Sequence, residues 1–273
     1  MREFQGKGAF VTGGASGVGF ALAHEFGRAK MRVMLADIEV GALTAAVAEL
    51  KGQGIDAHGV ECDVADRASV QHAAKETFAV LEKVHLVCSN AGVGCGGPLE
   101  LVTPGDWDWV IGVNLMGFVH VIQAFLPRLK EQGEGGHIAT TVSVVGMVCT
   151  AGTGPYNATK FGNVAIAETL AAELAGSPIG VTILCLGNVQ TRIADSARNR
   201  PARYGAATKT TPEAYEQLAT LVRMGQSPQE VAEKAMRGIM ENELFVFTHP
   251  EFRNLLEDRF QRILGAYPSP AAA

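Results

Sequence analysis

The stretch Thr12-Gly13-Gly14-Ala15-Ser16-Gly17-Val18-Gly19 lies between a short apolar run, residues 9–11, and a helical pattern over about 18–29. A glycine-rich turn of this kind lets backbone N–H groups approach a phosphate closely, because glycine has no Cβ atom. The helix that begins there adds free N–H groups and the positive end of its dipole. The spacing G-x-x-x-G-x-G differs from the common G-x-G-x-x-G fingerprint, and on spacing alone a purely structural turn is an equal alternative. The position between strand and helix favours a pyrophosphate loop, with contacts from Gly13, Ser16, Gly17, Val18 and Gly19.

Short apolar runs alternate with longer amphipathic stretches along the whole chain. This alternation indicates βαβ units, and therefore a parallel sheet with helices on both faces. We predict an α/β fold with one doubly wound, Rossmann-type sheet in a single domain over residues 1–266. Residues 191–227 are expected to form an irregular substrate lid, and 267–273 a flexible tail. The sequence predicts strands over 9–11, 32–36, 55–61, 84–88, 137–142, 181–186 and 244–248, and helices over 18–29, 40–50, 68–81, 106–130, 156–174 and 228–240, with one more at the C-terminus.

Charge and composition exclude several classes of partner. Lysines and arginines number 23 against 28 aspartates and glutamates, a formal net charge of −5 without a basic block. Neither nucleic acid nor an anionic membrane is favoured by such a surface. No signal peptide or stretch near the roughly 18 apolar residues that span a bilayer is expected. The five cysteines lack C-x-x-C spacing, which favours free thiols in the cytoplasm over disulfides or a metal site.

Asp37 ends the second predicted strand, about 20 residues beyond the glycine loop. An acid at this position hydrogen-bonds the ribose of NAD and repels the extra phosphate of NADP, and the neighbouring Ile38 is uncharged. For Asp37 alone, a solvated cap of the next helix is an alternative. Asp63 and Val64 follow the third strand and would flank the adenine, with a turn aspartate as the alternative. These residues together predict NAD as the cofactor.

A candidate active site follows the fifth predicted strand. Tyr156 and Lys160 are four residues apart on a predicted helix, so they share one face. Ser143 precedes Tyr156 by thirteen residues and lies at the carboxyl end of the sheet, where open α/β folds bind their ligands. Each residue alone has an ordinary alternative, as a packing tyrosine, a solvated lysine and a loop hydroxyl. Their combination after a glycine loop predicts a catalytic site.

With these motifs, the sequence resembles the short-chain dehydrogenase/reductase family over essentially its whole length. The matching motifs are Thr12–Gly19, Asn90-Ala91-Gly92, Asn114, Ser143 and Tyr156–Lys160. The resemblance implies that Asn90, Ala91 and Gly92 stabilise the fourth strand end beside the cofactor. It also implies that Asn114, as a fourth member of the catalytic set, holds a water that links Lys160 to solvent.

The stretch Leu186-Gly187-Asn188-Val189-Gln190-Thr191 departs from the P-G-x-V-x-T pattern of the family. Leu186 replaces the proline, which predicts a less rigid loop. The resemblance still implies contacts of Val189 and Thr191 with the nicotinamide carboxamide and the phosphate.

The expected reaction is hydride transfer between NAD and a carbinol or ketone. A phenol with a pKa near 10 is a poor base at neutral pH, but Lys160 and an oxidised nicotinamide ring would favour the phenolate of Tyr156. Tyr156 would then act as general base in oxidation and general acid in reduction. Ser143 would hydrogen-bond the substrate oxygen, and Lys160 would also hold the nicotinamide ribose.

The expected substrate pocket is largely apolar, which favours an uncharged or aromatic substrate. It is assigned to Ser143, Tyr156, Val145, Cys95 and Cys149. The stretch 194–205 is similar to that of bacterial Cα-dehydrogenases of lignin-derived aryl ethers, which implies a benzylic carbinol. Within this stretch, Arg198, Arg200 and Arg203 have two open roles, contact with a polar substrate tail or solvated surface charge.

Three alternatives stay open at the level of sequence. A 3-oxoacyl or steroid-type ketone reductase would use the same scaffold. A catalytically inactive NAD-binding sensor or scaffold is opposed by the complete catalytic set. A metal-dependent dehydrogenase is opposed by seven histidines without ligand spacing, so no metal is expected. The family resemblance also suggests a homo-oligomer, a tetramer or a dimer, built on the long helices.

Overall fold

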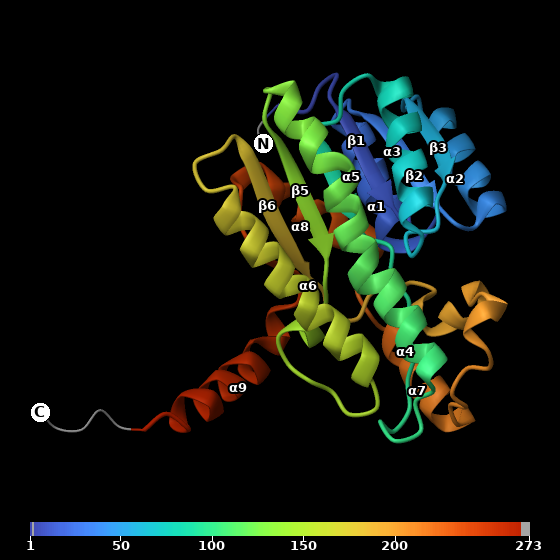
Figure 1. Cartoon of the computed structure of the whole chain (residues 1–273), viewed down its shortest axis with the longest axis vertical. Helices are drawn as coiled ribbons and strands as arrows, with labels where there is room; N and C mark the ends of the chain where they lie inside the picture. The colour runs from blue at the N-terminus through green and yellow to red at the C-terminus, as the bar shows by residue number, and fades with distance from the viewer. Residues whose placement is uncertain (2, 269–273) are drawn as a thin grey trace, which may run out of the picture.

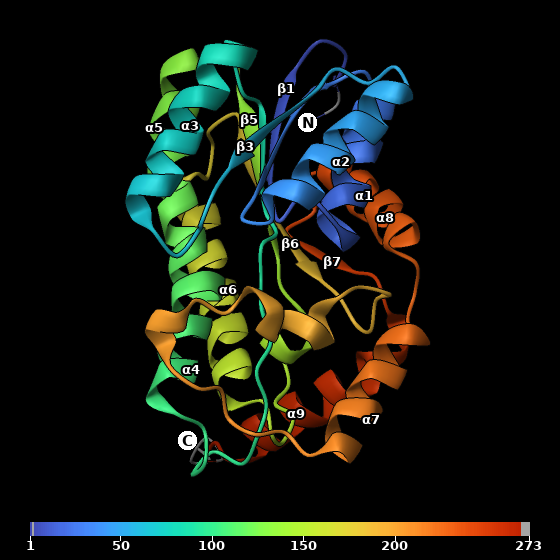
Figure 2. The same ribbon diagram turned by 90° about the vertical axis from the view of Figure 1, so that its right-hand side faces the viewer.

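Seven parallel strands form one sheet in the order β3-β2-β1-β4-β5-β6-β7, with helices on both faces (Figures 1 and 2). The computed structural model describes residues 1 and 3–268. The predicted doubly wound α/β fold in one domain is confirmed. The strands are β1 Gly8–Thr12, β2 Arg32–Asp37, β3 Ala57–Glu61, β4 Leu86–Ser89, β5 Gly136–Thr141, β6 Ile179–Cys185 and β7 Phe245–Phe247. The α-helices are α1 Gly17–Arg28, α2 Val40–Gly52, α3 Arg67–Leu81, α4 Pro104–Val110, α5 Gly117–Gln132, α6 Gly154–Glu173, α7 Pro212–Arg223, α8 Pro228–Glu241 and α9 Arg253–Gly265.

Two hydrophobic cores hold the three layers together. Helices α1, α2 and α8 bury their apolar faces against one side of the sheet, and α3, α5 and α6 cover the other. The central strands are therefore buried on both faces, which explains their continuous apolar sequence. Strands β1 and β4 are parallel neighbours although two strands separate them in sequence, so the direction in which successive strands are added to the sheet reverses between them. In open α/β sheets, ligands bind at this switch point, outside the carboxyl ends of the strands.

The long helical segment Pro104–Gln132 is apolar and long enough to cross a membrane by length and composition alone. The sequence predicted no membrane-spanning stretch, and a core helix of the fold meets the same criterion of length and composition. Half of its most apolar window is buried inside the fold, where α5 packs on α3 and the sheet. The segment begins with Thr103, whose hydroxyl accepts from the Asp106 amide at 3.2 Å, and it contains a π-helical turn, Ile111–Met116.

The stretch 191–227 is more regular than the sequence predicted. It contains short 3-10 turns over Ile193–Asn199 and Ala202–Tyr204, followed by α7. Helix α7 has an ordinary start signal, since Thr211 accepts from the Ala214 amide at 3.2 Å and Pro212 takes the first helical position. Figure 2 shows this stretch crossing beneath the carboxyl ends of the strands.

Helix α9 leaves the body of the molecule (Figure 1) and has no buried residue. The side chains Leu255, Phe260 and Leu264 are exposed, and Arg259 lies over the Phe161 ring of α6 at 5.0 Å from its centroid. Most of the tail predicted to be flexible, residues 269–273, lies outside the described residues.

Candidate active site

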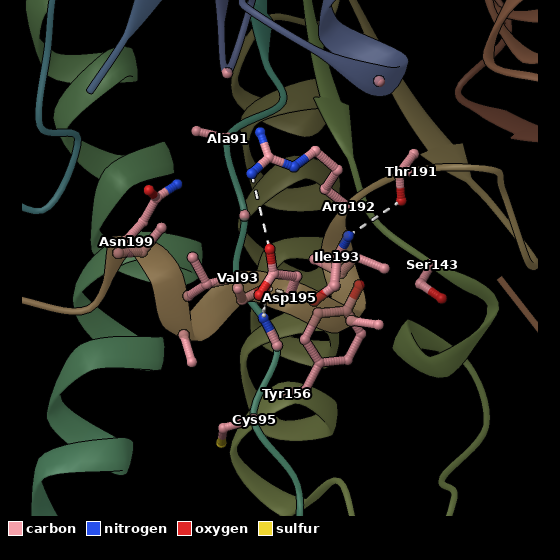
Figure 3. Close-up of a pocket in the computed structure, with 18 of the residues that line it drawn as sticks. Ala91, Val93, Cys95, Ser143, Tyr156, Thr191, Arg192, Ile193, Asp195 and Asn199 are labelled. Carbon is pink, nitrogen blue, oxygen red and sulfur yellow. Dashed lines mark hydrogen bonds and ion pairs between the residues drawn. The ribbon is translucent and has the colours of Figure 1, made fainter. Parts of the chain in front are cut away.

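A cavity of about 780 Å³ lies along the carboxyl edge of the sheet (Figure 3). It extends from the glycine loop and Asp37 at one end to Ser143, Tyr156 and Lys160 at the other. The structure brings nearly all predicted site residues to this cavity, although they come from separate parts of the chain. The predicted residues that line it are Gly13, Ser16, Gly17, Val18, Asp37, Ile38, Asp63, Val64, Cys95, Asn90, Ala91, Gly92, Ser143, Val145, Tyr156, Lys160, Val189 and Thr191.

The glycine loop forms a backbone cradle at the start of α1. Gly13 and Gly17 have φ angles of +64° and +54°, a conformation that side chains rarely adopt. A Cβ atom on Gly19 would lie 2.0 Å from the Gly13 carbonyl oxygen and 2.6 Å from Nδ2 of Asn90. The loop can close this tightly only with glycine, and it leaves room beside the helix N-terminus. These features fit the pyrophosphate of a dinucleotide.

Asn90 joins three strand ends beneath this cradle. Its Nδ2 donates to the Thr12 carbonyl at 3.1 Å, and its Oδ1 accepts from the Thr141 hydroxyl at 3.0 Å. The hydroxyl of Thr12 in turn accepts from the amides of Asn90 and Ala91 at 2.9 and 3.1 Å. The contacts fix the floor of the cavity at the carboxyl ends of β1, β4 and β5.

Asp37 lies at the end of β2, directly beside the glycine loop. Its carboxylate accepts from the amides of Ala15 and Glu39, each at 3.0 Å. Each oxygen keeps a free lone pair on the cavity side, because a carboxylate oxygen accepts more than one hydrogen bond. Asp63 follows β3 and accepts from the Ala65 amide at 3.0 Å and from Arg203 at 3.1 Å.

Lys160 is a buried cation at the centre of the site. Only 3% of the residue is exposed, and its Nζ donates to the Thr141 carbonyl at 2.8 Å. The same Nζ lies 5.4 Å from the centroid of the Tyr156 ring, one helical turn earlier. Burial lowers the pKa of Lys160 to about 8, so the side chain is mainly protonated at neutral pH.

Tyr156 projects into the cavity from the first turn of α6 (Figure 3). Burial raises the pKa of its phenol to about 12. Desolvation of the phenolate causes this rise, and a positive charge near the phenol would oppose it. The expectation that Lys160 and an oxidised nicotinamide ring together favour the phenolate stays a prediction.

Ser143 reaches the cavity from the end of β5, but its hydroxyl turns away from Tyr156 (Figure 3). It donates to the Leu186 carbonyl at 3.1 Å and accepts from the Val145 amide at 3.3 Å. A rotation about χ1 would redirect the hydroxyl to a substrate oxygen, at the cost of the weak bond to Leu186.

The loop in which Leu186 replaces the family proline is braced by His249, a residue that the sequence did not single out. The Gly187 amide donates to Nδ1 of His249 at 2.9 Å, and the opposite ring nitrogen lies 2.9 Å from the Asn188 carbonyl. These bonds require the tautomer protonated at Nε2. The two contacts restrain the loop that the missing proline was expected to loosen.

Asn114 lies in the π-helical turn, buried behind the cavity rather than lining it. Its side chain clamps Val93, with Oδ1 accepting from the Val93 amide at 2.8 Å and Nδ2 donating to its carbonyl at 2.9 Å. Its own main-chain carbonyl accepts from Nδ2 of Asn163 at 2.9 Å. Asn163, one turn beyond Lys160, is therefore a further buried partner that the sequence did not indicate.

The predicted substrate contact Cys149 does not line the cavity, and that prediction was wrong. The chain turns outward after the 3-10 turn Val144–Gly146, which leaves the Cys149 thiol exposed. Thr150 and Thr153 line the cavity instead, together with Cys95. The sequence also missed the apolar wall contributed by Trp109, Ile193, Tyr215, Leu218, Leu221 and Val222.

The three arginines of the stretch 198–203 bind protein carboxylates, which neither sequence alternative foresaw. Arg200 lies 2.6 Å from Asp106, and this pair is 6% and 1% exposed. Burial alone would raise the pKa of Asp106, but hydrogen bonds from Thr208 and Thr103, with the charge of Arg200, hold it below its usual range. Arg198 and Arg203 pair with Glu39 and Asp63.

Among residues 1 and 3–268, no group of three or more histidine, cysteine, aspartate or glutamate side chains is arranged to hold a metal ion.

Comparison with known proteins gives a consistent result. Residues 7–202 match the family described as short chain dehydrogenase. The C alpha-dehydrogenase of Sphingobium sp. (strain NBRC 103272 / SYK-6) is 39% identical over 266 residues, covering 97% of this chain and 87% of that protein. The 1-deoxy-11-beta-hydroxypentalenate dehydrogenase of Streptomyces avermitilis is 35% identical, over 96% of this chain and 91% of that protein. A short chain dehydrogenase/reductase from Burkholderia phymatum, solved in complex with NAD, is 37% identical, with a TM-score of 0.94 and complete coverage of both chains.

Gly19→Ala should disrupt the cradle, because the new Cβ would meet the Gly13 carbonyl oxygen. We expect a loss of about 1–3 kcal/mol in the free energy of unfolding and the loss of NADH binding. Urea denaturation and a fluorescence titration with NADH measure both. The matched control is Gly41→Ala on α2, where nothing lies within 4 Å and alanine should stabilise the helix by about 0.5–1 kcal/mol. Equal stability and affinity in Gly19→Ala and the control would refute the steric argument.

Lys160→Met should make the protein more stable at pH 7. The folded-state pKa of about 8 lies below the usual 10.5, so the buried ammonium destabilises the fold at pH values below 8. The shift in pKa corresponds to a penalty of roughly 3 kcal/mol, and the hydrogen bond to the Thr141 carbonyl offsets part of it. The penalty should disappear as the pH rises through 10.5.

We therefore expect a gain of about 2 kcal/mol in the free energy of unfolding at pH 7, shrinking toward pH 10, in urea titrations at both pH values. The control is Lys75→Met, at an exposed position on α3, whose free energy of unfolding should stay within about 0.5 kcal/mol of the wild-type value at both pH values. A Lys160→Met protein that is destabilised at pH 7 would contradict the assignment of a buried charge.

Proposed function

This chain belongs to the short chain dehydrogenase family, and from that premise we propose an NAD-dependent oxidoreductase that interconverts a secondary alcohol and a ketone, with Tyr156 as general acid/base. The family resemblance predicted from sequence is confirmed, as is the class of oxidoreductase. The observation that carries the proposal is the placement of Tyr156, Lys160 and Ser143 on one cavity with a glycine cradle at its other end. No observation favours the catalytically inactive alternative.

NAD is the proposed cofactor. Asp37 has its carboxylate where the ribose would lie, so a ribose phosphate would meet its negative charge. The Burkholderia phymatum structure, which contains NAD, supports this assignment. The cradle Gly13–Gly19 would hold the pyrophosphate, Asp63 and Val64 would flank the adenine, Asn90–Gly92 would lie along the cofactor, and Val189 and Thr191 would contact the nicotinamide end.

The chain's own residues would manage the proton. NAD, when bound, supplies the hydride acceptor and a positive charge on its nicotinamide ring. Tyr156 would take the hydroxyl proton of the alcohol in oxidation and return it in reduction. Lys160 would stabilise the phenolate and hold the nicotinamide ribose, and Ser143 would orient the substrate oxygen. Asn114 would position the Val93 end of the cavity and, through its main-chain carbonyl, the surroundings of Lys160.

The proposed substrate class is a benzylic carbinol of an aromatic compound. Besides the hydroxyls of Ser143, Tyr156, Thr150 and Thr153, the substrate end of the cavity is lined by Cys95, Val145 and the apolar wall that includes Trp109 and Leu218. A flat aromatic ring matches such a lining, whereas a sugar would leave its hydroxyl groups without partners. The Sphingobium relative is named a C alpha-dehydrogenase, which supports the same class.

We also propose a cytoplasmic homo-oligomer, a dimer or a tetramer. The exposed apolar side chains of α9 and the absence of any buried residue in that helix support association of copies. All five cysteines are free thiols, as expected in a reducing compartment. The formal net charge of −5 favours small uncharged substrates over nucleic acid as partners.

Tyr156→Phe should lower turnover of 1-phenylethanol with NAD by about 10²–10⁴-fold, because the proton acceptor is removed while the ring remains. Absorbance of the reduced nicotinamide measures turnover, and NADH fluorescence checks that the cofactor still binds. Tyr215→Phe removes the hydroxyl of another tyrosine on the cavity and should keep at least half of the activity.

The same assay distinguishes the alternatives when it includes a 3-oxoacyl thioester and a ketosteroid with NADH. Reduction of either, without turnover of benzylic carbinols, would contradict the substrate class. NAD binding without any turnover would favour the sensor, and a preference for NADP would contradict the role of Asp37.

A further inference from the structure

The segment after β6 reaches across the cavity to the end of β2. Glu39 receives three hydrogen bonds on one oxygen: two from the Arg198 guanidinium, at 3.1 and 2.7 Å, and one from Asn199, at 2.8 Å. Arg192 lies 3.5 Å from its other oxygen. The hydrogen bond from Arg198 lowers the pKa of Glu39, so the carboxylate stays charged at neutral pH. Glu39 is thus held by residues more than 150 positions later in the chain.

A second contact joins the same segment to the end of β3. Arg203 donates to Asp63 at 3.1 Å, and its guanidinium lies over the Tyr204 ring at 4.8 Å. Glu39 and Asp63 both line the cavity, at the ends of adjacent strands. Asp37 and Asp63 mark the adenosine end in the proposed function, so the segment 192–203 roofs that end of the cleft. In Figure 3, Arg192 and Asn199 both lie above Tyr156.

The contacts of the roof differ in how easily they open. The pair between Arg200 and Asp106 is buried and carries additional bonds from Thr103 and Thr208, so it fixes the segment at Arg200, between Arg198 and Arg203. The pairs of Glu39 with Arg198 and of Asp63 with Arg203 are partly exposed, at 21% and 24% and at 54% and 22% of the side chains. Partly exposed pairs are weaker and screened by salt, whereas breaking a buried pair is costly. The segment is therefore fixed at Arg200, and the contacts on either side of that point, Arg198 with Glu39 and Arg203 with Asp63, can open.

We propose that Glu39 is a positioning residue for the cofactor: it holds Arg198 and Asn199 over the adenosine half of the cleft, so that the dinucleotide leaves only when this contact opens. This inference rests on the proposed use of NAD and adds a role for the lid that is separate from substrate selection. Glu39 itself does not take part in hydride transfer, since it lies at the opposite end of the cavity from Tyr156.

The test is the rate of NADH dissociation, measured by stopped-flow fluorescence after displacement with excess NAD. Glu39→Gln and Arg198→Met should each release NADH about fivefold faster than wild type, as expected for the loss of a partly exposed ion pair. Arg198→Lys keeps the positive charge, so its rate of NADH release should lie between that of wild type and that of Arg198→Met. Raising KCl from about 50 to about 500 mM should accelerate release from the wild type more than from Glu39→Gln.

The matched control is Arg253→Met, which removes an ion pair of similar chemistry with Glu257 on α9, away from the cleft. It should release NADH at the wild-type rate. Unchanged release from Glu39→Gln and Arg198→Met, with NADH still bound, would overturn the proposed role of Glu39 and leave the proposed function intact. A wild-type protein that binds no NADH at all would contradict the proposed function itself.

Discussion

A buried positive charge at Lys160 is the constraint on which the catalytic end of the molecule depends. An ammonium group with 3% exposure is unfavourable unless its surroundings stabilise it. The Thr141 carbonyl, at the end of β5, is the partner that the fold provides. That contact joins the end of β5 to α6, and Tyr156 precedes Lys160 by one helical turn. The sheet edge therefore determines where the phenol projects.

The nucleotide end depends on a steric constraint rather than on charge. Gly19 packs so closely on Gly13 and Asn90 that no side chain fits. Asn90 in turn reaches Thr141, the residue whose carbonyl holds Lys160. A continuous set of hydrogen bonds thus links the cradle at the start of α1 to the buried lysine, through the ends of β1, β4 and β5. The two ends of the cavity are parts of one rigid floor.

The sequence predicted what is local. The sheet follows from apolar runs of strand length, and the cavity floor from the glycine loop and the spacing of Tyr156 and Lys160. It missed contacts between distant segments, because no periodicity relates Glu39 to Arg198 or Gly187 to His249. The outward turn that exposes Cys149 is likewise set by tertiary packing. Helix α7 is a different case, since Thr211-Pro212 is a start signal in the sequence that the prediction passed over.

Three ion pairs attach the segment 192–203 to the rest of the fold. The sequence left two roles open for three arginines of this segment, surface charge or contact with substrate. In the structure each of them instead forms an ion pair with a carboxylate of the protein, Glu39, Asp106 or Asp63. Only the pair with Asp106 is deeply buried. The roof over the adenosine end therefore combines a permanent attachment with contacts that can open, while the floor beneath it stays fixed.

The most direct test of the central claim follows the transferred hydrogen itself. The protein would be incubated with NAD and 1-phenylethanol that carries deuterium on the carbinol carbon, and the reduced cofactor would be analysed by NMR and mass spectrometry. Our account predicts acetophenone together with reduced cofactor that carries the deuterium at C4 of the nicotinamide ring. Deuterium found in the solvent, or an alcohol left unchanged by the wild-type protein with bound NAD, would contradict it.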